Sequence, residues 1–138
     1  MVLMEAQKLE LESTIDSLKE VEKLVDQVCT DYKVNEDFYG NILIAVTEAV
    51  NNAIIHGNKQ SPNKTFSVVF NPKEDQIIFS VSDQGEGFDF NSLPDPTDPE
   101  NLEKPNGRGV FLMKNLADKI EFEDSGRKVN ISFKIFSN

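Results

Sequence analysis

The chain has 138 residues, 38% of them hydrophobic, which is enough for one domain with a core of its own and too few for two comfortable ones. Its 24 acidic and 14 basic residues give a net charge of −10, which would repel nucleic acid, and no basic patch offsets that charge. The longest uninterrupted apolar run, Ile42 to Val46, is far shorter than the roughly 20 residues of a membrane span. We therefore expect a single domain over residues 1–138 that binds neither nucleic acid nor membrane.

The N-terminal residues lack the basic segment and apolar core of a secretory signal, so we expect a cytoplasmic protein. The single cysteine, Cys29, excludes an internal disulfide and cannot supply a zinc site. It falls on the apolar side of a predicted helix, where we expect a buried and unreactive thiol.

The first residues predict a strand followed by a helix. Lys8 to Glu12 alternates apolar and charged residues, which is typical of a short, half-buried strand. Ser17 and Glu20 have the spacing of a capping box. Leucine and valine residues then recur at helical spacing, which predicts an amphipathic helix from Leu18 through about Tyr32.

A second predicted helix, capped by Asn35 and ending at Gly57, carries an unusual set of polar residues. At about 100° per residue, one broad face is apolar and one narrow stripe holds Asn41, Glu48, Asn52 and His56. Consecutive asparagines, Asn51 and Asn52, are unfavourable inside a helix because the amide competes with the backbone for hydrogen bonds.

Glu48 and Asn52 lie four residues apart on this helix and therefore project side by side. A carboxylate there could orient or deprotonate a nucleophile, and an amide oxygen could bind a hard cation such as Mg²⁺. Solvated polar residues on an amphipathic helix would give the same pattern, so the segment alone leaves both interpretations open.

The second half of the chain predicts a hairpin, a long loop, a short helix and two more strands. The hairpin strands are Thr65–Phe70 and Gln76–Ser82, both rich in β-branched and aromatic residues. The segment from Asn91 to Asn106 has four prolines and no periodicity, which indicates a functional or disordered loop. The remaining elements are expected at Val110–Ala117, Lys119–Glu123 and Lys128–Phe136. This order predicts an α+β fold, a two-layer sandwich with a mostly antiparallel sheet covered on one face by helices.

Asp83 follows a predicted buried strand and precedes Gly85 and Gly87. A rigid carboxylate at this point could accept a hydrogen bond from an exocyclic amine such as that of adenine. The glycines would let the backbone bend tightly and let a planar base approach. An ordinary Asp-Gly turn at the end of a hairpin would have the same sequence.

Gly107-Arg108-Gly109 precedes the predicted short helix. Glycines allow close approach of the backbone, and the unpaired N–H groups at a helix start attract an anion, to which Arg108 would add a positive charge. A flexible loop that enters a helix would look the same. The proline-rich loop between the two glycine motifs is suited to close over a nucleotide.

In this order, three motifs resemble the nucleotide-binding boxes of the histidine-kinase-like ATPase superfamily: Glu48-x-x-x-Asn52, Asp83-x-Gly85-x-Gly87 and Gly107-x-Gly109. The short length and the segments ILIAVTEAVNNAIIHGN and GRGVFLMKNLAD look most like the stand-alone anti-sigma-factor serine/threonine kinases. The resemblance covers nearly the whole chain.

The resemblance also implies roles for individual residues. Glu48 would be the general base, and Asn52 would bind Mg²⁺ next to ATP. Asp83 would bind adenine, and the other ATP-binding residues would be Gly85, Gly87, Gly107, Arg108 and Gly109, with Lys104 as a second candidate for a phosphate contact. The resemblance gives His56 a structural or pocket-edge role rather than that of a phosphoacceptor.

The resemblance implies an ATP- and Mg²⁺-dependent kinase that binds a sigma factor, phosphorylates a serine or threonine of an anti-anti-sigma antagonist protein, and forms a homodimer. One alternative is a nucleotide-dependent partner-binding module of the same fold with little or no kinase activity. Glu48 favours the enzyme, because a pure binding module would not need a base. A detached catalytic domain of a histidine kinase is disfavoured, because no phosphoacceptor domain is present.

Overall fold

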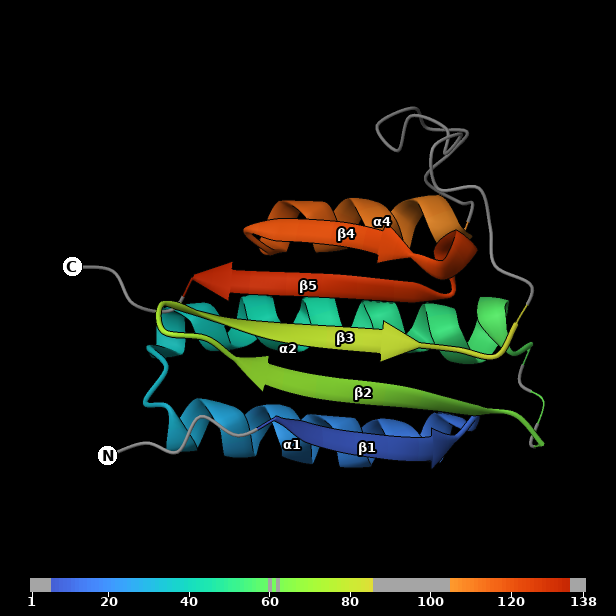
Figure 1. Cartoon of the computed structure of the whole chain (residues 1–138), viewed down its shortest axis with the longest axis horizontal. Helices are drawn as coiled ribbons and strands as arrows, with labels where there is room; N and C mark the ends of the chain where they lie inside the picture. Colours follow the sequence, from blue (N-terminus) through green and yellow to red (C-terminus); the bar gives the residue numbers. More distant parts are fainter. Residues whose placement is uncertain (1–5, 60, 62, 86–104, 135–138) are drawn as a thin grey trace.

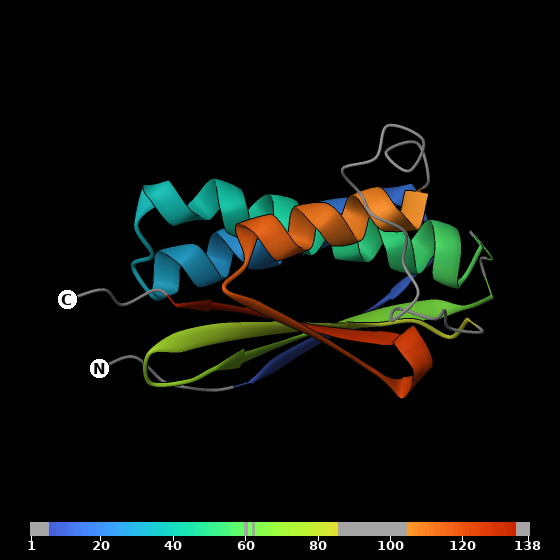
Figure 2. The same cartoon turned by 90° about the horizontal axis from the view of Figure 1, so that it is seen from above.

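Five antiparallel strands form one sheet, in the order β1-β2-β3-β5-β4. The structure is a computed structural model that describes residues 6–59, 61, 63–85 and 105–134, with side chains from residue 109 onward in the last range. The helices of these residues all lie on one face of the sheet (Figures 1 and 2). The predicted two-layer α+β sandwich is therefore confirmed.

The strands and helices of the described residues have the following bounds. The strands are β1 (Gln7–Glu12), β2 (Thr65–Pro72), β3 (Gln76–Ser82), β4 (Lys119–Glu123) and β5 (Lys128–Lys134). The helices are α1 (Leu18–Asp31), α2 (Glu36–Asn51) and α4 (Pro105–Leu116), and the short helical turns are η1 (Ile15–Ser17), η2 (Asn52–Gly57) and η4 (Asp124–Gly126).

The core lies between the sheet and the apolar faces of α1 and α2. Alternate residues of β2 and β3 point into it, among them Phe66, Phe70 and Phe79, which are at most 1% exposed. The predicted apolar face of the second helix is buried throughout, with exposures of 0–3% for Ile42, Val46, Ala49, Val50, Ala53 and Ile54. This helix, Glu36–Gly57, is long and apolar enough by composition to cross a membrane. Its burial identifies it as the central helix of the domain core.

The two predicted helix caps have different outcomes. Asn35 caps α2 as expected, because its Oδ1 accepts a hydrogen bond from the Asp37 N–H at 2.9 Å. The predicted capping box at Ser17 and Glu20 is wrong, because the Ser17 side chain makes no capping hydrogen bond. Residues Ile15–Ser17 already form a helical turn, so Ser17 has helical angles instead of the extended angles of a cap, and its Oγ donates to the Glu12 carbonyl at 2.8 Å.

The second helix reaches Gly57 as predicted, but its last turn is wider than an α-helix. In η2 the backbone is π-helical, and the Asn58 N–H donates to the carbonyl of Ala53, five residues earlier, at 2.8 Å. Cys29 is buried in the core, as expected, and burial together with the neighbouring Asp26 raises the pKa of its thiol to about 11.

The last helix begins earlier than predicted. It starts at Pro105 instead of near Val110, so Gly107, Arg108 and Gly109 lie within its first turns rather than in a loop before it. Proline is favourable at the first helical position because its fixed φ suits the helix and its missing N–H costs nothing there. Apart from its last two residues, the predicted loop Asn91–Asn106 lies outside the described residues, as do Gly87 and Lys104.

Candidate functional site

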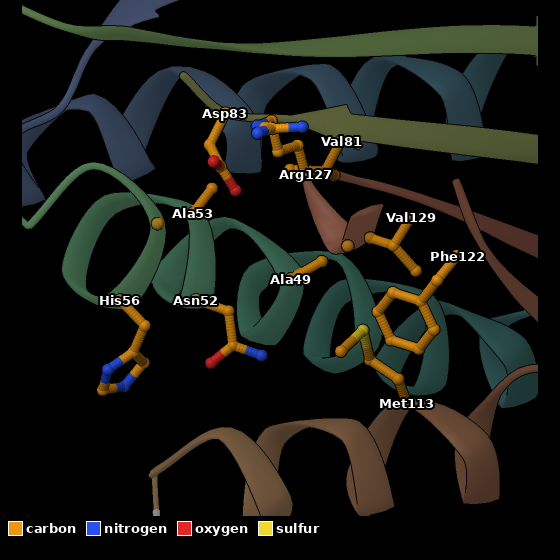
Figure 3. A pocket seen from close by; sticks show the side chains of 12 residues that line it. Ala49, Asn52, Ala53, His56, Val81, Asp83, Met113, Phe122, Arg127 and Val129 are labelled. Carbon is orange, nitrogen blue, oxygen red and sulfur yellow. The ribbon is translucent and has the colours of Figure 1, made fainter. Parts of the chain in front are cut away.

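A pocket opens where the end of the central helix meets the end of β3 (Figure 3). One wall comes from α2 and η2, a second from the end of β3, and the rest from α4, β4, β5 and the turn between the last two strands. Its lining residues are Ala49, Asn52, Ala53, His56, Gly57, Val81, Asp83, Met113, Phe122, Gly126, Arg127 and Val129. The pocket therefore combines apolar side chains with polar groups that come from separate elements.

Asn52 occupies the first position of the π-helical turn η2. Its half-buried side chain reaches toward α4, where a Cβ on Gly109 would lie 2.7 Å from the Asn52 Nδ2. Glycine at position 109 therefore leaves room for the Asn52 side chain in the position that it occupies. π-Helical turns inside α-helices occur frequently at functional sites, and here the turn sets the position of Asn52 in the pocket wall.

Asp83 is fixed at the end of β3 by its backbone and its side chain. Its N–H donates to the carbonyl of Arg127 at 2.9 Å, which continues the pairing of β3 with β5. Its Oδ1 accepts from the Gly85 N–H at 2.8 Å. The carboxylate points from the sheet toward the central helix, on the side of Ala53 (Figure 3).

The backbone of the central helix lies against the Asp83–Gly85 turn, and glycines make this contact possible. A Cβ on Gly57 would lie 2.4 Å from the carboxylate of Asp83, and a Cβ on Gly85 would lie 2.0 Å from the Gly57 carbonyl oxygen. Gly57 was predicted only as a helix terminator. Gly85 was predicted to make room for a base, whereas its observed effect is to make room for the helix end.

Burial changes the pKa of two ionisable groups in the pocket. It raises the pKa of Asp83, and the Gly85 N–H and the positive charge of Arg127 only partly oppose that rise. It lowers the pKa of His56, which favours the neutral imidazole. His56 lies at the pocket, in agreement with its predicted edge position.

Two residues that support the site were missed by the sequence analysis. Arg127 donates from Nε to the Gly85 carbonyl at 2.8 Å and lines the pocket. Asn58 accepts at Oδ1 from the Gln84 N–H at 2.7 Å. Both lie in segments that were interpreted only as a turn or a helix end, and no sequence pattern links them to Asp83.

Glu48 and Gly107, which were also predicted as site residues, lie in α2 and in α4. Glu48 lies one turn before Asn52 and is half-buried, but it is not among the residues that line the pocket. Gly107 lies in the first turn of α4, where backbone N–H groups have no partner within the helix. The side chain of Arg108 is not described. The roles assigned to these residues remain predictions.

The donors at this site suit Mg²⁺ that arrives together with a phosphate ligand. Mg²⁺ generally keeps several waters and takes one or two protein ligands plus phosphate oxygens, so it needs no cluster of protein carboxylates. The described residues contain no group of three or more His, Cys, Asp or Glu side chains placed to hold a metal ion. The Asn52 amide oxygen in the pocket wall could supply the protein ligand.

Replacement of Gly57 tests the contact between the helix end and the Asp83–Gly85 turn. Gly57→Ala would place a methyl group against the carboxylate, so we expect the free energy of unfolding to fall by about 1–3 kcal/mol. Gly40→Ala is the matched control, because a Cβ at Gly40 in α2 would have no neighbour within 4 Å. It should raise stability by about 0.5–1 kcal/mol. Equal urea-unfolding midpoints for the two variants would contradict the close contact.

The raised pKa of Asp83 predicts a pH-dependent stability cost. An acid with a raised pKa in the folded state binds its proton more tightly there, so its ionised form destabilises the fold above that pKa and has no effect below the ordinary aspartate range. Asp83→Asn keeps an oxygen that can accept from the Gly85 N–H. We expect it to unfold at a higher temperature than wild type at pH 7, with the difference vanishing as the pH falls below the ordinary aspartate range.

Asp75→Asn, in the exposed turn between β2 and β3, controls for the removal of one negative charge from an acidic chain. Thermal unfolding of the three proteins between pH 3 and pH 8 measures the effect. An Asp83→Asn variant that is less stable than wild type at pH 7 would contradict the desolvation of this carboxylate.

Comparisons with known proteins agree with this geometry. Residues 11–133 match the histidine kinase-like ATPase domain. The serine-protein kinase RsbW of Bacillus cereus (strain B4264) is 34% identical over 93 residues, which are 62% of this chain and 58% of the relative. The serine-protein kinase RsbW of Staphylococcus aureus (strain JH9) is 32% identical over 97 residues, which are 64% of this chain and 61% of the relative. The chain thus spans about three-fifths of these curated relatives.

A solved structure shows the same fold. It contains the RsbU and RsbW domains of Rv1364c from Mycobacterium tuberculosis, and the alignment covers 95% of this chain and 32% of that one, with a TM-score of 0.65 and 15% identity. The match to the domain model covers most of the sequence and includes every described element except β1, whose first residues precede it, and the last residue of β5. This chain belongs to the histidine kinase-like ATPase domain family.

Proposed function

We propose that this chain is an ATP-dependent protein serine/threonine kinase that also binds a sigma factor. The observation that carries the proposal is the pocket that Asp83 and Asn52 both line at the end of the central helix. Membership of an ATPase family implies the use of ATP, and the similarity to serine-protein kinases supports transfer of its phosphate to a protein.

Adenine fits the end of the pocket that Asp83 and the apolar residues form. The carboxylate accepts a hydrogen bond from the exocyclic amine of the base, and a carbonyl oxygen at the same place would be repelled. Val129, Met113 and Phe122 supply the apolar surface against which a planar ring packs. This arrangement selects adenine over bases that carry an oxygen at that position.

The phosphates extend from the base toward Asn52 and the start of α4. The Asn52 amide oxygen would hold Mg²⁺, which would reduce the negative charge of the phosphates. Free N–H groups near Gly107 face an anion at the positive end of the helix dipole. Gly109 belongs to the same site, because its missing Cβ gives the Asn52 side chain its place.

Glu48 accepts the proton of the attacking hydroxyl group. It lies one helical turn from Asn52, on the side of the helix that carries the predicted metal ligand. The serine or threonine oxygen of the substrate forms the new bond to the γ-phosphorus, the bond to ADP breaks, and the hydroxyl proton goes to the carboxylate. Because Glu48 lies outside the pocket lining, the acceptor hydroxyl would enter from a separate protein bound at the mouth.

The position of Glu48 also favours a second candidate function. A carboxylate outside the pocket wall is compatible with a nucleotide-dependent binding module that transfers no phosphate. In that case the nucleotide would order the site, and a partner would recognise the ordered surface.

The proposed partners are a sigma factor and an antagonist protein that carries the phosphorylated serine or threonine. We also propose that the chain acts as a homodimer in the cytoplasm. These proposals rest on the resemblance to anti-sigma-factor kinases and on the similarity to the RsbW kinases.

Glu48→Gln separates the kinase from the binding module. The amide keeps the size and polarity of the side chain but cannot take a proton, so we expect transfer of the γ-phosphate to fall by roughly 10²–10⁴-fold. ATP binding should persist, because Asn52 and Asp83 are unchanged. The assay follows labelled phosphate on a candidate antagonist protein and checks that the product is stable to acid, as phosphoserine is.

Glu22→Gln, on α1, removes one carboxylate from another helix and serves as the control. Equal transfer by wild type and Glu48→Gln would exclude Glu48 as the base. No transfer by wild type to a partner that it binds would favour the binding module instead.

A further inference from the structure

Asn58 is a buried polar residue at the centre of a hydrogen-bond network next to the pocket. It is 1% exposed and follows directly on the last residue of η2. Its Nδ2 donates to the Ser13 Oγ at 2.7 Å and to the Thr65 carbonyl at 2.9 Å, and its Oδ1 accepts from the Gln84 N–H at 2.7 Å. A buried carboxamide with both ends bonded is held in one orientation.

These bonds join four separate segments of the chain. The Ser13 Oγ donates in turn to the Lys64 carbonyl at 2.8 Å, which ties the segment after β1 to the segment before β2. The Asn58 N–H belongs to the π-helical turn, and the Asn58 side chain reaches the turn after β3. The helix end, the start of β2 and the Asp83–Gly85 turn are therefore connected through one side chain.

We infer that Asn58 is a positioning residue for base recognition, acting through the backbone of Gln84 on the carboxylate of Asp83; this inference rests on the proposed binding of adenine by Asp83. The turn is held on one side by Arg127, which accepts from the Asp83 N–H and donates to the Gly85 carbonyl. Asn58 holds the middle of the turn on the other side. Without it, the turn would keep only the bonds to Arg127 and the bond that the Gln84 Oε1 accepts from the Thr65 N–H at 2.7 Å. None of these holds the Gln84 N–H, so the carboxylate could shift away from the exocyclic amine.

Asparagine suits this position because it has an acceptor and two donors on one short, planar group. Aspartate offers the acceptor for the Gln84 N–H but no donor for the Thr65 carbonyl, and alanine offers neither. The two substitutions therefore separate the bond to the turn from the bonds to the rest of the network.

The test compares ATP with ITP, which carries an oxygen where adenine carries the amine, by titration calorimetry of the full chain with Mg²⁺ present. Wild type should prefer ATP by about tenfold or more, since a mismatched hydrogen bond at a carboxylate costs on the order of 1–3 kcal/mol. Asn58→Ala should reduce this preference to about twofold or less. Asn58→Asp should keep most of the preference even where its thermal stability falls.

Ser13→Ala is the matched control, because it removes both side-chain hydrogen bonds of Ser13 in the same network but leaves the Gln84 N–H bonded to Asn58. It should lower the unfolding temperature and leave the ratio of the ITP and ATP dissociation constants unchanged. All titrations are made well below the unfolding temperature of each variant. If Asn58→Ala does not fold, Asn58→Leu, which keeps about the size of the side chain without a donor or an acceptor, is titrated in its place. An intact preference for ATP in that variant overturns the inference, as does loss of the preference in Asn58→Asp or Ser13→Ala.

If Asn58 has a purely structural role, Asn58→Ala should be less stable but should still prefer ATP. That result would overturn the inference about Asn58 and leave the proposed adenine recognition standing. Wild type that binds neither nucleotide, or binds both equally, would overturn the proposed adenine recognition and this inference with it. The two failures are therefore distinguishable in one set of titrations.

Discussion

The contact between the end of the central helix and the turn after β3 is the constraint on which the site depends. Two glycines, Gly57 and Gly85, bring the two backbones closer than any side chain would permit, and the carboxylate of Asp83 lies against the first of them. Because α2 is packed in the core along its whole apolar face, its end has a fixed position. The sheet therefore fixes the backbone of Asp83, and the helix end fixes the position of its carboxylate.

The structure accepts a local cost at this contact. The Asp83 carboxylate is partly removed from water, which raises its pKa, and the last helical turn is widened to a π-helix at Asn52. Features of this kind are unfavourable for stability and commonly mark functional sites, where surrounding structure holds them in place. Here the support comes from Arg127 on one side of the turn and Asn58 on the other.

Much of the fold could be predicted from the sequence because local patterns determine it. The alternation in Gln76–Ser82 and the apolar face of the central helix each follow from one periodicity, and the strand and helix agree with them. The start of α4 was placed too late, because glycines at 107 and 109 suggested a loop and the role of Pro105 as a first helical residue was overlooked.

The site was predicted less completely, for a physical reason. Asn52 stands out because an asparagine inside a helix is unfavourable, and Asp83 because it lies between a buried strand and a glycine motif. The structure brings both to one pocket. Gly57, Asn58 and Arg127 act through contacts with residues far away in the chain, such as the bond from Arg127 to Gly85. Such contacts depend on the packing of the whole domain, and no local sequence pattern reveals them.

The central claim is that the pocket binds ATP and that Asp83 recognises its base. Titration calorimetry of ATP with Mg²⁺ into wild type and Asp83→Asn tests it most directly, because the substitution replaces a pure acceptor by a group that also presents a donor to the adenine amine. We expect wild type to bind and the variant to bind about tenfold or more weakly. Equal affinity of the two proteins for ATP would contradict the assignment of Asp83.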